Sequence, residues 1–203
     1  MPAIVTTGVR LAPPFGDVVV PDVSVPARGV TLLEGRNGSG KSAFVELCAG
    51  TLRAVRGSVR VLDLDPADPR SLGRRSVCRT SVALAQGASV RQHVRLFARH
   101  ARVPESTYLA RLRAHGSLDW VDVPTQRLST GLARLAWVVL ATTPQRALML
   151  LDEPFLGLDD EAARILHGEI DAWARAGSVV LVDHGGDRAW TGGAHRIAMG
   201  TAR

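Results

Sequence analysis

Residues 35–42 read Gly35-Arg36-Asn37-Gly38-Ser39-Gly40-Lys41-Ser42, the pattern G-x-x-x-x-G-K-S with an additional glycine at Gly38. The apolar run before it, residues 30–33, favours a buried strand, and residues 43–49 favour a helix. This strand–loop–helix order is the setting in which the pattern binds phosphate. Glycines allow a tight turn that aims backbone N–H groups at phosphate oxygens, and the helix adds its positive end. We expect Lys41 to reach the β- and γ-phosphates and Ser42 to ligate Mg²⁺.

Lys41 is the only lysine of the chain, because the other 24 of its 25 basic residues are arginine. A compact ammonium and a forked guanidinium are not interchangeable. A single lysine at this position therefore favours phosphate binding over the alternative of a glycine-rich turn without a ligand.

The composition of the chain favours one globular domain. Its 203 residues are 46% hydrophobic, which suffices for a sizeable core and leaves room for a small inset subdomain. No apolar run approaches the roughly 18 residues of a membrane span, and no signal peptide is visible. Cys48 and Cys78 are isolated, which favours buried thiols over a disulfide. These features predict a cytoplasmic protein.

Positive charge is concentrated in one segment of the chain. Residues 70–113 contain ten arginines and one acid, Glu105, which gives +9, whereas the remainder has 15 basic and 18 acidic residues, which gives −3. Within this segment Arg91, Arg95 and Arg99 recur every four residues, so that they share one face of a predicted helix. Such a patch indicates an anionic partner, and a solvated helix face is the alternative.

Three further apolar runs end in residues suited to phosphate chemistry. We expect strands over residues 81–85, 147–151 and 179–182, which lead to Gln86, to Asp152-Glu153 and to Asp183-His184. In open α/β sheets ligands bind at the carboxyl ends of the strands. An apolar strand that ends in Asp-Glu supplies a carboxylate for Mg²⁺ and a neighbouring general base for water. Each of these residues alone could be an ordinary strand end or turn, but their shared position argues for one site.

Taken together, these motifs resemble those of the ATP-binding cassette (ABC) ATPases over nearly the whole chain. Residues 35–42 match the Walker A loop, Gln86 matches the Q-loop, and Leu148 to Glu153 match the Walker B strand with its catalytic glutamate. Residues 128–132, Leu-Ser-Thr-Gly-Leu, resemble the signature motif that distinguishes this family from other Walker A proteins.

Three shorter matches extend the resemblance. Leu158-Asp159 is similar to the end of the D-loop, His184 to the switch histidine, and Phe15 to the aromatic residue that stacks on adenine. The sequence also departs from the family pattern in two places. Leu132 stands where the family usually has Gln, and the D-loop lacks its commoner Ser. We interpret both as tolerated variation.

The resemblance implies an α/β fold: a P-loop NTPase (RecA-like) core with an N-terminal antiparallel β portion and a small inset helical subdomain. It implies a single domain over residues 1–203, with the inset at 87–128. It also implies ATP and Mg²⁺ as ligands. The implied site residues are, for catalysis, Glu153, His184 and Gln86; for the nucleotide, Phe15, Asn37, Gly38, Ser39, Gly40, Lys41, Ser42, Ser129 and Gly131; and for Mg²⁺, Ser42, Gln86 and Asp152.

The implied function is that of an ATP-hydrolysing subunit that powers an ABC transporter through separately encoded transmembrane permease subunits. One copy of each motif implies a homodimer, or a heterodimer with a second ABC ATPase. The basic segment suits an anionic membrane surface, which places the protein on the inner face of the cell membrane. Two alternatives remain. One is a soluble ATPase acting on nucleic acid, against which the scarcity of aromatic residues in the basic segment argues. The other is a hydrolysis-impaired partner, which Leu132 suggests.

Overall fold

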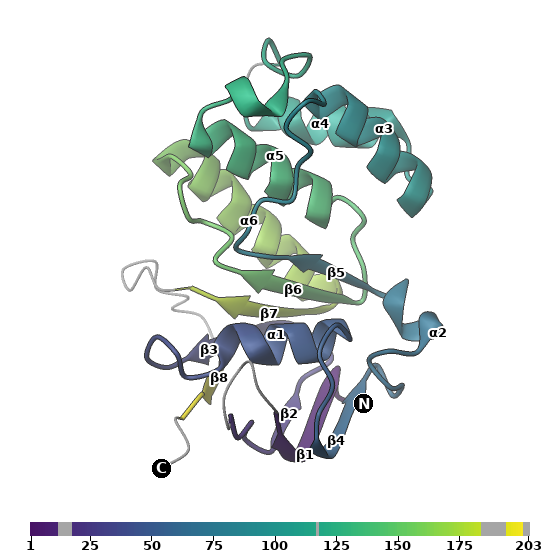
Figure 1. Ribbon diagram of the computed structural model, residues 1–203, viewed down its shortest axis with the longest axis vertical. Helices are drawn as coiled ribbons and strands as arrows, with labels where there is room; N and C mark the ends of the chain where they lie inside the picture. Colours follow the sequence, from purple (N-terminus) through teal and green to yellow (C-terminus); the bar gives the residue numbers. More distant parts are fainter. Residues whose placement is uncertain (12–17, 117, 184–193, 201–203) are drawn as a thin grey trace.

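The computed structural model describes residues 1–11, 18–116, 118–183 and 194–200. Two sheets enclose the first helix, α1 (Lys41–Ala49), and a group of helices covers the far face of the larger sheet (Figure 1). The smaller sheet is antiparallel, in the order β2 (Val23–Val25), β1 (Ile4–Arg10), β4 (Arg56–Val61). Its buried residues pack with those of α1 in one apolar cluster.

The larger sheet is entirely parallel and runs in the order β5 (Arg75–Cys78), β6 (Leu148–Asp152), β7 (Ser178–Val182), β3 (Gly29–Glu34), β8 (His195–Ala198). Side chains alternate between its faces. In β6, Leu148 and Leu150 join the cluster around α1, whereas Met149 and Leu151 join a second cluster on the opposite face. Both faces of the sheet are therefore covered, which explains why the strand reads as a continuous apolar run.

Helices α5 (Thr130–Thr142) and α6 (Asp160–Ala176) supply that second cluster. Helices α3 (Val90–Ala101) and α4 (Glu105–Ala114) pack on α5 from its other side and form a third cluster, at the top of Figure 1. Because α5 lies between two clusters, it is buried on most of its circumference, which accounts for its apolar sequence. None of the described helices is long and apolar enough to cross a membrane.

Short elements join these layers. Helix α2 (Pro69–Leu72) precedes β5, and a 3₁₀ turn over Thr125–Arg127 leads to α5. Helix α3 begins with a capping box, in which the Ser89 side chain accepts from the Gln92 backbone and the Gln92 side chain accepts from that of Ser89. Helices α3 and α4 both lie within residues 87–128, but they share their core with α5. The limits of the predicted inset subdomain stay a prediction.

One expected strand is wrong. Residues 81–85 form no strand, and the sheet position belongs to β5, which pairs with β6 over Arg75–Cys78. Four of the five residues at 81–85 are exposed. Gln86 consequently does not end a strand, because seven residues separate it from Cys78.

An ion-pair network joins α4 to α6. Arg111 donates through Nε and Nη2 to the two carboxylate oxygens of Glu169, at 2.7 and 2.6 Å, and its guanidinium lies 5.1 Å from the ring centre of Trp173. The fully buried His115 side chain lies 3.5 Å from the same carboxylate. Burial would raise the pKa of Glu169, but hydrogen bonds from His115 and Arg111 outweigh it and lower the pKa from 4.5 to about 2.

We predict that Glu169→Gln destabilises the fold by about 2–3 kcal/mol at neutral pH, because the change leaves the Arg111 charge buried without its partner. A lowered folded-state pKa means that the stabilisation is present above the unfolded value and is lost as the carboxylate protonates. The difference between wild type and variant should therefore shrink as the pH falls from 4.5 towards 2. Urea unfolding at several pH values measures it.

Glu161→Gln on the same helix is the matched control, since Glu161 forms an exposed ion pair with Arg164. Its effect should stay within about 0.5 kcal/mol. An equal loss of stability in the two variants would contradict the prediction.

Candidate nucleotide site

The phosphate loop joins β3 to α1 in the expected geometry. Gly38 and Gly40 have φ values of 81° and 93°, in the left-handed region that favours glycine. A Cβ on Gly40 would also lie 2.6 Å from a methyl carbon of Val18. The first turn of α1 contains no acidic residue, so the positive end of the helix is not neutralised there.

Lys41 is held inside this loop. Its side chain is buried, and Nζ donates to the carbonyl oxygens of Gly35 at 2.7 Å and Arg36 at 3.1 Å. These two carbonyl oxygens fix the position of the ammonium group. Ser42, the next residue, is exposed at the mouth of the loop.

Asp152 and Glu153 stand at the end of β6. The Asp152 carboxylate is 6% exposed, and its Oδ1 is buried without a hydrogen-bond partner among the described residues. Glu153 has a φ of 51°, a left-handed conformation that costs a residue with a side chain about 1–2 kcal/mol. Its backbone N–H donates to the Val182 carbonyl at 2.9 Å, which extends the pairing of β6 with β7 by one residue.

A cavity of about 560 Å³ brings the loop and the carboxylates together. The phosphate loop and its helix form one wall, and the residues after β5 and β6 form the other. The lining residues are Val18, Asn37, Gly38, Gly40, Lys41, Ser42, Ala43, Thr80, Asp152, Glu153 and Leu156.

The oxygen atoms of this cavity fit a magnesium ion. Hard cations prefer oxygen ligands, and Mg²⁺ is usually bound by one or two carboxylates together with substrate phosphates and water. The unpartnered Asp152 Oδ1 and the Ser42 hydroxyl lie on the same cavity. Within the described ranges no group of three or more His, Cys, Asp or Glu side chains could hold a metal ion by itself. A magnesium ion at this place would take its remaining oxygen ligands from the nucleotide and from water.

Other predicted site residues lie elsewhere. Gln86 is exposed and absent from the cavity lining, and its carbonyl accepts from the Gln126 N–H at 3.2 Å. Ser129 caps α5 by accepting from the Leu132 N–H at 3.2 Å, and neither Ser129 nor Gly131 lines the cavity. A Cβ on Gly131 would lie 2.9 Å from the Gly157 carbonyl, so α5 begins against the segment after β6. Phe15 and His184 lie outside the described residues.

Sequence reasoning missed Arg134, a buried arginine on α5. Its guanidinium binds four backbone carbonyls, those of Arg79, Thr80, Asp152 and Glu153, and so joins the two segments that form the second wall of the cavity. Burial lowers the pKa of Arg134, and the neighbouring Cys78, Asp152 and Glu153 oppose that effect. A charged residue inside an otherwise apolar helix was the available signal.

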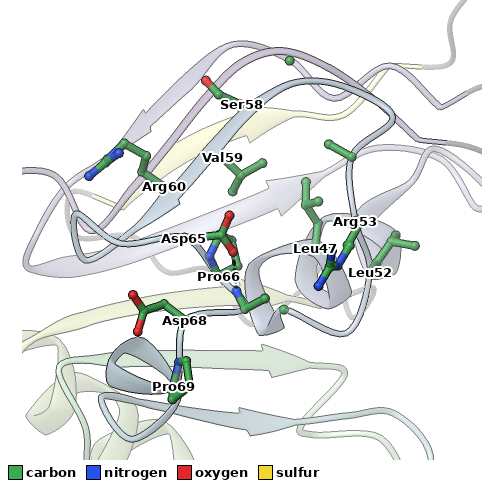
Figure 2. A pocket seen from close by; sticks show the side chains of 14 residues that line it. Leu47, Leu52, Arg53, Ser58, Val59, Arg60, Asp65, Pro66, Asp68 and Pro69 are labelled. Atoms are coloured by element: carbon green, nitrogen blue, oxygen red, sulfur yellow. Dashed lines mark hydrogen bonds between the residues drawn. The ribbon is translucent and has the colours of Figure 1, made fainter.

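A larger cavity, of about 790 Å³, lies at the other end of α1 (Figure 2). It is lined by the end of α1, the loop with Leu52 and Arg53, β4 and residues 65–69. Its two carboxylates already have partners: Asp68 pairs with Arg70 at 2.7 Å, and Asp65 accepts from the Ala67 N–H at 2.7 Å. The helix that begins at its lining, α2, has only four residues, and the Asp68 carboxylate already caps its N-terminus, so it offers less to a phosphate than the N-terminus of α1 does.

Comparison with known proteins agrees with this geometry. The ABC transporter family model matches residues 21–156. The chain belongs to the ABC transporter family. It is 33% identical to the cytochrome c biogenesis ATP-binding export protein CcmA of Cupriavidus pinatubonensis over 87% of this chain and 82% of that protein. It is 31% identical to the Nod factor export ATP-binding protein I of a Bradyrhizobium species over 89% of this chain and 61% of that protein.

Solved structures show the same fold. An ATP-binding subunit of an ABC transporter superposes with a TM-score of 0.78 at 22% identity, over 90% of this chain and 79% of that one. A putative ABC transporter ATP-binding protein from Pyrococcus furiosus superposes with a TM-score of 0.77 at 12% identity, over 98% of this chain and 99% of that one.

By its family and its curated relatives, the protein is an ATP-binding, ATP-hydrolysing subunit of the transporter type, which implies partners in a membrane. These comparisons do not support an ATPase that acts on nucleic acid.

The two cavities can be told apart by mutation. We predict that Lys41→Ala lowers ATP turnover on the order of a hundredfold, because the loop loses the charge that faces the phosphates. Arg53→Ala, in the larger cavity, should leave turnover unchanged. A steady-state ATPase assay of both variants is the measurement, and undiminished turnover in Lys41→Ala would refute the assignment of the site.

Proposed function

We propose that two cassettes, either two copies of this chain or this chain and a paralogue, close over two ATP molecules and hydrolyse them to drive a separately encoded membrane permease. The observation that carries this proposal is the division of the motifs. The phosphate loop and the Walker B carboxylates share one cavity, whereas Ser129 and Gly131 lie outside it.

In this proposal Lys41 and the backbone of residues 37–42 bind the phosphates. Ser42 and Asp152 would hold Mg²⁺, which when bound would neutralise charge on the phosphate oxygens, and Gln86 would reach the ion on closure. Glu153 accepts a proton from the attacking water. For Phe15 and His184 we keep the roles that the sequence predicts, adenine stacking and contact with the γ-phosphate.

The start of α5 supports a role towards a second chain. The first turn of α5 contains no acidic residue, so its N-terminus offers positive potential and backbone N–H groups to an anion. Ser129 is exposed there. Leu156, at the edge of the nucleotide cavity, is 58% exposed, which leaves an apolar side chain in water unless a partner covers it.

We predict that Glu153→Gln binds ATP, fails to hydrolyse it, and accumulates as a closed dimer. The amide keeps the shape of the side chain but removes the base and one negative charge beside the phosphates. Closure needs only the phosphate loop of one cassette and the start of α5 of the other. Size-exclusion chromatography with and without Mg-ATP, together with an ATPase assay, measures both effects.

Two outcomes would count against this scheme. A variant that remains monomeric with ATP bound would mean that Leu132 has disabled this signature or that the partner is a different chain. A variant that turns over at the wild-type rate would place the base elsewhere.

Ser129→Arg in the Glu153→Gln background should abolish the dimer without weakening nucleotide binding by the monomer.

For the membrane partner we propose the outer face of α3, which would keep the protein peripheral on the inner face of the membrane. Arg91 pairs with Asp122 at 2.6 Å, and Arg95 lies 3.8 Å from Glu105. The predicted basic stripe is therefore partly neutralised. Leu96, on the same helix, is 64% exposed and adds an apolar contact.

We predict that Arg95→Glu with Arg99→Glu weakens binding to vesicles that contain anionic lipid, since each basic residue contributes about 1 kcal/mol near such a surface. Arg91 is kept, because it also ties α3 to the loop that contains Asp122. The pair Arg164→Glu and Arg175→Glu on α6 matches the change in charge and should bind as wild type does. Vesicle sedimentation measures binding. Equal losses in both pairs would show an effect of net charge alone.

A further inference from the structure

Arg134 is a buried cation whose hydrogen bonds, among the described residues, all go to backbone carbonyls. It lies on α5, five residues after the Ser129 cap, and is 2% exposed. Nη1 donates to the carbonyls of Arg79 and Thr80, both at 2.8 Å. Nη2 donates to the carbonyls of Asp152, at 3.2 Å, and Glu153. None of these hydrogen bonds goes to a carboxylate, whereas the largely buried Arg111 is paired with Glu169.

The four carbonyls belong to the segments that leave β5 and β6 towards the nucleotide cavity. Thr80, Asp152 and Glu153 all line that cavity. Thr80 also donates its hydroxyl to the Asp152 carbonyl, at 3.4 Å, and the Trp137 indole donates to the Arg79 carbonyl at 3.0 Å. The guanidinium is thus the point at which the start of α5 and both strand ends are joined.

The backbone conformation of Glu153 depends on these contacts. Its φ of 51° is one that a glutamate rarely adopts, so the surrounding contacts must hold it there. Among the described residues three hydrogen bonds hold its backbone: its N–H donates to the Val182 carbonyl, and its own carbonyl accepts from Arg134 and from the Leu156 N–H at 3.2 Å. The bond from Leu156 closes only a local turn, whereas the bond from Arg134 ties the carbonyl to α5. Without Arg134 the peptide after Glu153 keeps only the local turn, and its orientation relative to α5 is no longer fixed.

We propose that Arg134 is a positioning residue for ATP hydrolysis. By binding the carbonyls of Asp152 and Glu153, it holds the Glu153 carboxylate in the orientation in which it takes a proton from water, and it touches neither the nucleotide nor the water. The inference rests on the proposed role of Glu153 as the base.

The test compares two buried arginines of the same chemistry. Arg75 is 6% exposed and likewise binds backbone carbonyls, those of Ala49 and Pro66, together with the Ser71 hydroxyl, and none of these groups lines the nucleotide cavity. Arg134→Met and Arg75→Met remove the same guanidinium and should lower thermal stability similarly. If Arg134 had a purely structural role, Arg134→Met and Arg75→Met would change kcat by a similar factor.

We expect Arg134→Met to lower kcat by about a hundredfold while the Kd for Mg-ATP changes by less than about threefold. Arg75→Met should keep the wild-type kcat. If Arg134→Met does not fold, Arg134→Lys serves in its place, because one ammonium retains the charge but cannot span four carbonyls. Added guanidinium, below denaturing concentrations, should restore part of the kcat of Arg134→Ala and leave that of Arg75→Ala unchanged.

A double mutant separates this inference from the proposal on which it rests. In the Glu153→Gln background, Arg134→Met should cause no further loss in single-turnover rate, because the group that it positions is absent. Additive losses, or an equal kcat in Arg134→Met and Arg75→Met, would overturn the positioning role and leave the base assignment standing. Wild-type turnover in Glu153→Gln would overturn the base assignment and the positioning role together.

Discussion

The register of β7 with its two neighbours is the constraint on which the site depends. Val182 is paired with Leu33 of β3 on one side and with Asp152 of β6 on the other. The phosphate loop and the Walker B carboxylates therefore leave the sheet at the same level, two strand spacings or about 10 Å apart. This separation leaves room for phosphate and a metal ion between them. A shift of one residue in the pairing of β6 with β7 would turn Asp152 to the other face of the sheet, and the same shift in the pairing of β3 with β7 would turn the strand that leads into the phosphate loop.

Prediction from the sequence succeeded where a residue type has one dominant use. Glycines at φ above zero, a lysine directed into their loop, and a wholly apolar strand before Asp152 are dictated locally, and the structure has each of them. Residues 81–85 form an apolar run that suits a strand, but a strand requires a neighbour, and the place beside β6 is occupied by β5. Strand β5 begins with Arg75, a residue type that normally argues against a buried strand. It is accommodated because carbonyls at the end of α1 and beyond satisfy its guanidinium.

Charge counted along a segment of sequence overstates the charge that the folded segment leaves unpaired. All residues of 70–113 are described, and its ten arginines gave +9 in the sequence. Five of these arginines have an acidic partner: Arg70, Arg79, Arg91, Arg95 and Arg111. A sixth, Arg75, is buried and donates to backbone carbonyls. Most of the acidic partners come from outside the segment, namely Asp68, Glu46, Asp122 and Glu169. Folding thus brings in counter-charges that a window of sequence does not contain.

Arginine is suited to this use in a way that lysine is not. A guanidinium presents five donors in a fixed plane, so that one side chain can join several carbonyls from different elements. Arg75 joins β5 to the end of α1, Arg111 joins α4 to α5 and α6, and Arg134 joins α5 to the ends of β5 and β6. An ammonium at any of these positions would leave carbonyls unsatisfied. Lys41 is used differently, because its compact ammonium is buried within one loop and donates only to the carbonyls of Gly35 and Arg36. The single lysine of the chain thus lies in the loop for which we propose phosphate binding, whereas arginines join separate elements elsewhere.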